Sequence, residues 1–171
     1  MTRFYVIDTN VLLDASAVNN PRLHVSPDNR DLCEQAYAWL CRFATPDDVL
    51  VMDNQGRLEE EYEHKLEYND FGRQVVRQKW NRGQVLAVDV LYDDEGYAWL
   101  DEPLASAVHD HSDRKLVAAA LEALKQGPCR IVNASDTDWY DWQDELGKNG
   151  IEVLQLLPEW SHDKWLEKKH P

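Results

Sequence analysis

The sequence predicts an α/β fold with three layers, in which a mostly parallel central sheet lies between two layers of helices. Short apolar runs alternate with amphipathic segments along the chain, which is the pattern of strands joined by covering helices. The chain has 171 residues, of which 43% are hydrophobic and 7 are Trp, enough for one domain with its own core. We expect this domain to span residues 1–157 and residues 158–171 to form a C-terminal helix or tail.

Two buried strands and three helices are predicted in the first half of the chain. Residues 3–8 form the first short strand, and residues 49–52 form the second, which is followed by a turn at residues 53–56. Helices are predicted where apolar side chains recur at helical spacing or where charged segments follow a strand, over residues 30–44, 57–68 and 71–80.

The second half continues the alternation after one irregular segment. Residues 85–91 predict a third strand, whereas residues 92–112 show no clear periodicity. A strong amphipathic helix is predicted from Ser112, and Gly127-Pro128 closes it. The remaining elements are a strand over residues 129–133, a Trp-rich acidic helix and a strand over residues 151–154.

The net charge of −14 argues against binding of nucleic acid through a broad basic surface. It does not exclude an enzyme that acts on nucleic acid, because some of the acids can be metal ligands and substrate contacts can be local. No apolar run approaches the roughly 20 residues that span a bilayer, and the first apolar run is too short for a signal-peptide core. We therefore expect a cytoplasmic protein without a membrane segment.

Two aspartates occur where predicted buried strands end. Asp8 ends the first strand, and Asp136 follows the strand over residues 129–133. Ligands bind outside the carboxyl ends of parallel strands, and carboxylates that converge there raise each other's pKa unless a cation joins them. The sequence therefore predicts a divalent-metal site, with Asp113 and Glu61 as further candidates. Helix capping is the alternative for each aspartate, and a solvated side chain is the alternative for Glu61.

Four short motifs resemble those of the PIN-domain family of metal-dependent nucleases, and they occur along the chain in the same order as in that family. The four acids lie in the segments Tyr5–Leu13, Leu58–Tyr62, Ser112–Ala120 and Asn133–Trp139. The motifs span residues 5–139, which is most of the chain. Two departures occur. In the fourth motif, Ala134 stands where many members of the family have Thr or Ser, and Ser135 follows one residue later. In the second motif, three glutamates follow one another, and Glu61 matches the family's acid better than Glu59 or Glu60.

The resemblance implies a PIN-like fold and hydrolysis of phosphodiester bonds, most often in RNA, with Mg²⁺ or Mn²⁺. Asp8 and Asp136 would be direct metal ligands, and Asp113 would bind directly or through water. Glu61 would orient a water molecule or complete the site. These cations prefer oxygen ligands and lower the pKa of water. One ion, or two ions about 3.5–4 Å apart, would fit this chemistry.

Other residues are predicted to support the acids or to contact the substrate. Thr9 and Asn10 are expected to shape the loop after the first strand and to hydrogen-bond the acids, with helix capping as the alternative. Ser135 and Asp138 are auxiliary candidates. Candidate phosphate contacts, with Trp80 interleaved for base stacking, are Arg114, Lys115, Arg73, Arg77 and Lys79. An exposed helix with Trp80 packed inward is the alternative for the last three.

The leading functional hypothesis is an endoribonuclease. The resemblance suggests the toxin of a toxin–antitoxin pair, with an inhibitory protein partner, while RNA processing, defence or cleavage of DNA flaps would use the same site. The main alternative is a catalytically weak PIN-like module that binds a protein partner. A phosphatase with an aspartyl nucleophile fits less well, because Asp8-Thr9-Asn10 lacks the second aspartate that such enzymes need. The Trp-rich segments predict either core residues or a homodimer face.

Overall fold

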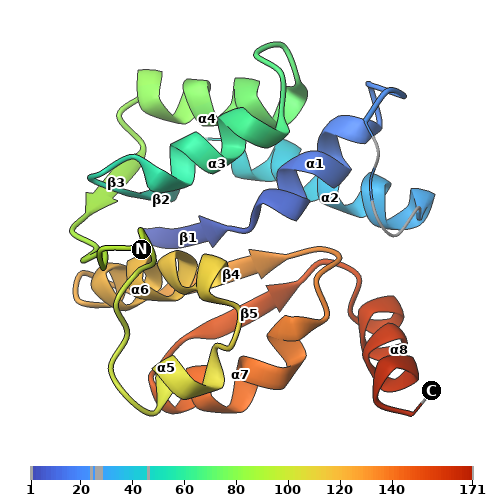
Figure 1. The fold of residues 1–171 in the computed structure, drawn as a ribbon. Coiled ribbons are helices and arrows are strands. Elements are labelled where there is room, and N and C mark those ends of the chain that lie inside the picture. Colours follow the sequence, from blue (N-terminus) through green and yellow to red (C-terminus); the bar gives the residue numbers. More distant parts are fainter. Residues whose placement is uncertain (1, 24, 26–28, 46, 171) are drawn as a thin grey trace.

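Five parallel strands form the centre of the computed structural model, which describes residues 2–23, 25, 29–45 and 47–170. The strand order is β3-β2-β1-β4-β5, and helices cover both faces of the sheet (Figure 1). This confirms the predicted three-layer α/β fold. The strands are β1 (Arg3–Ile7), β2 (Asp48–Asp53), β3 (Val85–Val88), β4 (Cys129–Asn133) and β5 (Glu152–Gln155).

Strand β1 lies in the middle of the sheet, where the path of the chain across the sheet reverses. It pairs with β2 on one side, with Phe4 opposite Val49, and with β4 on the other, with Ile7 opposite Val132. The chain moves outward from β1 to β3 and then returns to β4. In open α/β sheets a ligand binds at such a reversal, outside the carboxyl ends of the strands. The residues that follow β1 and β4 are therefore neighbours.

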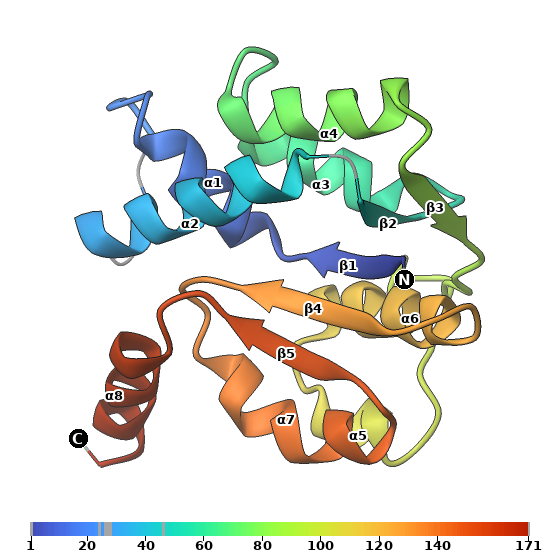
Figure 2. The ribbon, with the colours of Figure 1, turned by 180° about the vertical axis from the view of Figure 1, so that it is seen from behind.

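The helices form two layers, as expected when each crossover between parallel strands is right-handed. Figures 1 and 2 show α1 (Thr9–Ala17), α2 (Arg30–Phe43), α3 (Arg57–Lys65) and α4 (Phe71–Asn81) on one face, and α5 (Leu104–Ala107), α6 (Arg114–Leu124) and α7 (Asp138–Lys148) on the other. Helix α6 contacts four strands of the sheet. Its buried alanines, Ala119, Ala120 and Ala123, allow this close approach.

Some boundaries differ from the prediction. The sequence pattern does not predict α1 as a separate helix, and β3 ends at Val88 instead of residue 91. Helix α3 ends at Lys65 because Leu66 is extended. The irregular segment contains one antiparallel bridge, between Tyr92 and Ala98, then α5 and the 3₁₀ helix η1 (His111–Asp113).

The C-terminal segment is a helix, α8 (Pro158–Lys169), with Pro171 outside the described residues. It lies beside α7 at the end of the molecule toward which β4 points (Figures 1 and 2). Trp139 and Trp142 of α7 are fully buried, so these two are core residues and do not form a dimer face. Within the described residues, no helix combines the length and apolar character needed to cross a membrane.

Candidate metal centre

Three aspartates from separate parts of the chain converge at the carboxyl edge of the sheet. Asp8 follows β1, Asp113 ends η1 directly before α6, and Asp136 lies between β4 and α7. Each offers a carboxylate oxygen, and these three oxygens all lie within 4.8 Å of one another. We call these residues the acid cluster. One hard cation fits this donor set, which consists of oxygen atoms from more than one carboxylate.

Two hydrogen bonds fix the side chain of Asp8. The indole Nε1 of Trp139 donates to Oδ2 at 2.8 Å, and the backbone N–H of Asn10 donates to Oδ1 at 3.4 Å. The backbone N–H of Asp8 also donates to the carbonyl of Val132 at 3.1 Å, which ties the residue to β4. The bond from Asn10 is a helix cap, so Asp8 both caps α1 and belongs to the acid cluster.

Helix capping does not account for the other two acids in the same way. Among the described residues, no backbone N–H of α6 donates to the side chain of Asp113, although this residue is in the capping position. Asp136 accepts one hydrogen bond, from the backbone N–H of Asp138 at 2.9 Å. Asp138 therefore contacts the cluster through its backbone and orients the carboxylate of Asp136.

Two asparagines join the loop after β1 to the loop after β4. The side chain of Asn10 accepts from the backbone N–H of Ala134 at 2.9 Å and donates to Oδ1 of Asn133 at 3.0 Å. Asn133 accepts from the backbone N–H of Asp136 at 3.1 Å and donates to its carbonyl at 2.7 Å. The Asn10 side chain thus supports the acids through the second loop and not by bonding a carboxylate. The sequence prediction omits Asn133, although an amide at the end of an apolar strand signals such a role.

Burial and mutual repulsion raise the pKa values of the whole acid cluster. Burial, and then the charge of Asp136, raise the pKa of Asp8 to about 7. Burial, and then the charge of Asp8, raise the pKa of Asp113 to about 9, and burial also raises the pKa of Asp136. Three carboxylates in one place cannot all be ionised at low cost without a cation. The electrostatics therefore fit a site that binds positive charge.

Glu61 lies next to the acid cluster but outside it. The hydroxyl of Thr9 donates to one carboxylate oxygen of Glu61, and Nζ of Lys115 lies 2.9 Å from the other. The charge of Glu61 contributes to the raised pKa of Asp8. Glu59 instead accepts from Trp80 and Glu60 pairs with Arg57, so Glu61 is the member of the run that faces the cluster.

Asp14, on α1, is a buried acid that the sequence prediction misses. Its Oδ2 has no hydrogen-bond partner among the described residues. Burial is the main cause that raises the pKa of Asp14 to about 7. A hydrogen bond with the Ser135 side chain lowers this pKa, and the charge of Asp8 raises it. The signal for it is a charged residue on the apolar face of the segment that begins at Thr9. Asp14 therefore lies close enough to the cluster to share its electrostatics, and Ser135 contacts Asp14.

Two of the predicted phosphate contacts, Lys79 and Arg114, hydrogen-bond backbone carbonyls of the protein. The side chain of Lys79 is fully buried, and its Nζ donates to two backbone carbonyls, at 2.6 and 3.2 Å. The guanidinium of Arg114 donates to the carbonyls of Val108, at 3.1 Å, and Ala105. Both side chains thus satisfy backbone carbonyl groups of other segments.

The basic residues of α4 make contacts away from the acid cluster. The guanidinium of Arg77 lies 3.8 Å from the ring centroid of Tyr68 and donates to its carbonyl at 2.6 Å, and Arg73 lies 3.8 Å from the carboxylate of Glu63. Trp80 is 46% exposed, which contradicts the alternative in which it packs inward. Arg73 and Arg77 thus contact residues of α3 and of the connection between α3 and α4.

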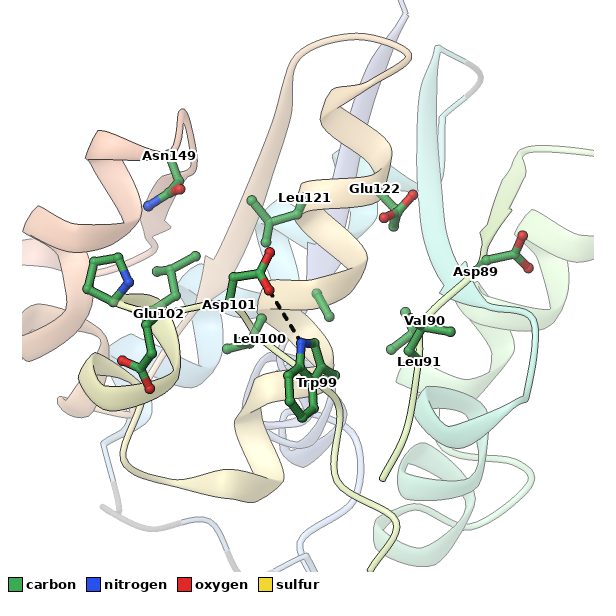
Figure 3. A pocket seen from close by; sticks show the side chains of 13 residues that line it. Asp89, Val90, Leu91, Trp99, Leu100, Asp101, Glu102, Leu121, Glu122 and Asn149 are labelled. Carbon is green, nitrogen blue, oxygen red and sulfur yellow. Dashed lines mark hydrogen bonds between the residues drawn. The ribbon is translucent and has the colours of Figure 1, made fainter. Parts of the chain in front are cut away.

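One cavity adjoins the acid cluster and another lies apart from it. The first has a volume of about 500 Å³ and is lined by Asp8, Asn10, Ser135, Asp136, Thr137, Trp160, Lys164 and Lys168. The second, of about 360 Å³, lies between the segment at residues 89–91, α5 and α6 (Figure 3). Its exposed Trp99 donates to Asp101, and no member of the acid cluster lines it. The two aspartates of the acid cluster in its lining therefore identify the first cavity as the candidate site.

Comparison with known proteins adds no identification. No family model matches the chain, and neither the curated proteins nor the solved structures include a significant match. The resemblance to PIN-domain nucleases consequently rests on the four sequence motifs alone.

Proposed function

We propose that this protein is a Mg²⁺- or Mn²⁺-dependent nuclease that hydrolyses phosphodiester bonds, with RNA as its substrate. The observation that carries the proposal is the convergence of three carboxylate oxygens within 4.8 Å, from segments that follow β1, η1 and β4. Chance proximity of surface acids would leave them solvated, whereas burial raises the pKa of all three. A structure that keeps such a cluster at the switch point of an α/β sheet is suited to bind a cation.

The donor set favours a hard divalent cation. Asp8, Asp113 and Asp136 supply only oxygen atoms, and Mg²⁺ or Mn²⁺ sites are built from carboxylates together with water and substrate oxygens. A cation held by these residues would lower the pKa of water and offset negative charge on a phosphodiester. Because Trp139 and Asp138 hold Asp8 and Asp136 in place, little rearrangement would be needed for binding.

The Glu61 carboxylate lies beside the acid cluster, where it could accept a proton. The hydroxyl of Thr9 and the ammonium group of Lys115 orient its carboxylate by direct contact. A carboxylate beside the cluster can accept a proton from a water molecule that attacks phosphorus. Lys115, predicted as a phosphate contact, would instead act through Glu61.

The resemblance to the PIN-domain family favours RNA over DNA. The toxin of a toxin–antitoxin pair is one setting, in which a protein partner would restrain the activity. RNA processing and defence would use the same acids.

A cleavage panel tests this proposal. Structured RNA, single-stranded RNA, single-stranded DNA and flap DNA are incubated with Mn²⁺, Mg²⁺ or chelator, using the wild type, Asp8→Asn and the control Asp94→Asn. Asp94 is an exposed acid in the loop before Trp99, so its variant matches the loss of charge only. We expect metal-dependent cleavage that Asp8→Asn abolishes and Asp94→Asn retains. Cleavage by folded Asp8→Asn would refute the assignment, and a folded, metal-bound wild type that cuts nothing would favour the non-catalytic module.

A further inference from the structure

Three side chains of α8 form a stripe that faces the acid cluster. Trp160, Lys164 and Lys168 are spaced four residues apart, which places them on one side of a helix. All three line the cavity of about 500 Å³ that also contains Asp8 and Asp136. An aromatic ring and two ammonium groups thus line the same cavity as two carboxylates of the acid cluster. We call these three residues the α8 stripe.

The other side of α8 is anchored to α7, so the stripe has a fixed position. The buried hydroxyl of Ser161 lies 2.9 Å from the hydroxyl of Tyr140. The indole of Trp165 stacks on Tyr140 with ring centroids 5.7 Å apart and donates to Asp141 at 2.9 Å. Lys169 pairs with the same carboxylate at 3.0 Å. These contacts hold the helix without using any residue of the stripe.

Among the described residues, the two lysines of the stripe have only weak partners. Lys168 donates to the hydroxyl of Thr137 at 2.8 Å, and its charge lowers the pKa of Asp136, although burial dominates there. Lys164 lies 3.3 Å from Glu167 and is 42% exposed, and surface pairs of this kind contribute little stability. Both ammonium groups can therefore exchange these partners for a phosphate at low cost.

A nucleic acid needs such cations at this site, because the protein carries a net charge of −14 and the acid cluster repels phosphates. Of the described residues that line this cavity, Lys164 and Lys168 are the basic ones. Arg114 and Lys79 are engaged with backbone carbonyls elsewhere. The α8 stripe thus supplies the positive charge that a bound strand would meet in this cavity.

We propose that this cavity binds single-stranded nucleic acid on one side of the bond to be cut. Lys164 and Lys168 would contact successive phosphates, and one base would stack on Trp160. The inference rests on the proposed nuclease function for the position of the cut, but not for the binding itself. A single strand is favoured over a duplex, because a base can stack on a protein ring only after it leaves its own helix. Stacking tolerates every base, so the cavity selects strandedness and not sequence.

Binding of labelled oligonucleotides tests the proposal. Fluorescence anisotropy is measured with single-stranded RNA, single-stranded DNA of the same sequence, and the matching duplexes, over a series of salt concentrations. Ca²⁺ replaces Mg²⁺ because it also takes oxygen ligands, and gels confirm that the strands remain intact. The variants are Lys164→Gln/Lys168→Gln, Trp160→Ala and Trp160→Phe. The matched control is Lys125→Gln/Lys148→Gln, which removes two exposed lysines that likewise pair with a glutamate three residues away.

We expect single strands to bind more tightly than duplexes. The double lysine variant should weaken binding about tenfold or more and lower the log–log salt slope by about 1.4, since each lost phosphate contact on a single strand removes about 0.7. Trp160→Ala should weaken binding roughly tenfold, while Trp160→Phe retains most of the affinity. The control variant should bind like the wild type, and thermal unfolding should show that every variant is folded. The RNA and DNA arms show which sugar the cavity accepts.

The outcomes separate this inference from the nuclease proposal. If the lysine variant keeps the wild-type affinity and salt slope, or if the wild type binds no strand, the α8 stripe is not a nucleic-acid site, whatever the cleavage panel shows. If duplexes bind as tightly as single strands and Trp160→Ala has no effect, the stacking role is wrong. If strands bind through the lysines but Mg²⁺ and Mn²⁺ support no cleavage, the binding site stands and the nuclease proposal fails.

Discussion

Replacement of Asp113 by asparagine should stabilise the metal-free protein, even though Asp113 is a proposed metal ligand. Burial, followed by the charges of Asp8 and Asp136, raises the pKa of Asp113 from 3.8 to about 9. Between these values the native state holds a proton that the unfolded chain releases. The stability that this proton contributes is therefore complete below about pH 4 and is lost as the pH rises through about 9. Asparagine keeps the shape of the side chain and removes the charge.

The magnitude follows from the same linkage. The native state holds one proton more than the unfolded chain over the roughly 3 pH units between the unfolded pKa of Asp113 and pH 7. Each of these units changes the free energy of unfolding by about 1.4 kcal/mol. The ceiling is therefore about 4 kcal/mol. Relief of repulsion is shared with the other two acids, and a buried amide has its own desolvation cost. We expect Asp113→Asn to raise the free energy of unfolding by about 2 kcal/mol in chelator at pH 7.

Urea unfolding with EDTA at pH 5, 7 and 9 measures the effect. The wild type should lose stability as the pH rises, Asp113→Asn should lose less, and the exposed-site control Asp94→Asn should follow the wild type. In Mn²⁺ the wild type should be more stable than Asp113→Asn, the reverse of the order in EDTA. A ligand that binds only the native state stabilises a protein more when its binding site is intact.

Two results would refute this reasoning. If Asp113→Asn is less stable than the wild type in EDTA at all three pH values, the carboxylate is a structural partner and not a strained acid. If Mn²⁺ stabilises both proteins equally, Asp113 does not contribute to cation binding.

Two further substitutions test one support of the acid cluster and the packing of α1 against α4. Trp139→Phe removes the indole bond to Asp8 and should weaken Mn²⁺ binding roughly tenfold in calorimetry, because supporting hydrogen bonds of this kind typically contribute about that much. Trp142→Phe, which removes a similar indole bond to His109, should leave Mn²⁺ affinity unchanged, and equal losses in both would show a packing effect only. Gly72→Ala should cost about 1–3 kcal/mol in urea unfolding, because its Cβ would lie 2.8 Å from Cβ of Leu12 on α1. Gly147→Ala, with open space around the added atom, should be neutral or stabilising, and a Gly72→Ala variant that matches it would show that α1 and α4 can separate.

The sequence predicts the sheet and the acid cluster well, for related reasons. Strands buried on both faces read as short apolar runs, and residues at their carboxyl ends must meet in a parallel sheet. Asp8 and Asp136 could therefore be located from the pattern alone. Asp113 could be located because it opens the Ala-rich helix that crosses the sheet.

The partners of charged side chains could not be predicted in this way. Lys79 binds backbone carbonyls at the start of β2 and just before it, and Arg114 binds carbonyls in and after α5. No residue pattern records where a carbonyl group will lack a partner. The α8 stripe was hidden for a similar reason, since the face that Lys164 and Lys168 present depends on how Tyr140 anchors the helix. Periodicity describes a helix by itself, whereas its orientation on the protein depends on the partner surface.

The central place of β1 has a consequence for the order in which the protein can be assembled. One edge of β1 pairs with β4, and the hydrogen bond between Asp8 and Trp139 joins residues 131 positions apart. During synthesis, which proceeds from the N-terminus, this edge stays unpaired until most of the chain has emerged, and unpaired edges promote aggregation. The acid cluster is likewise incomplete in any chain that ends before β4. A nascent chain, or a product truncated before β4, would thus carry an exposed strand edge and an incomplete acid cluster.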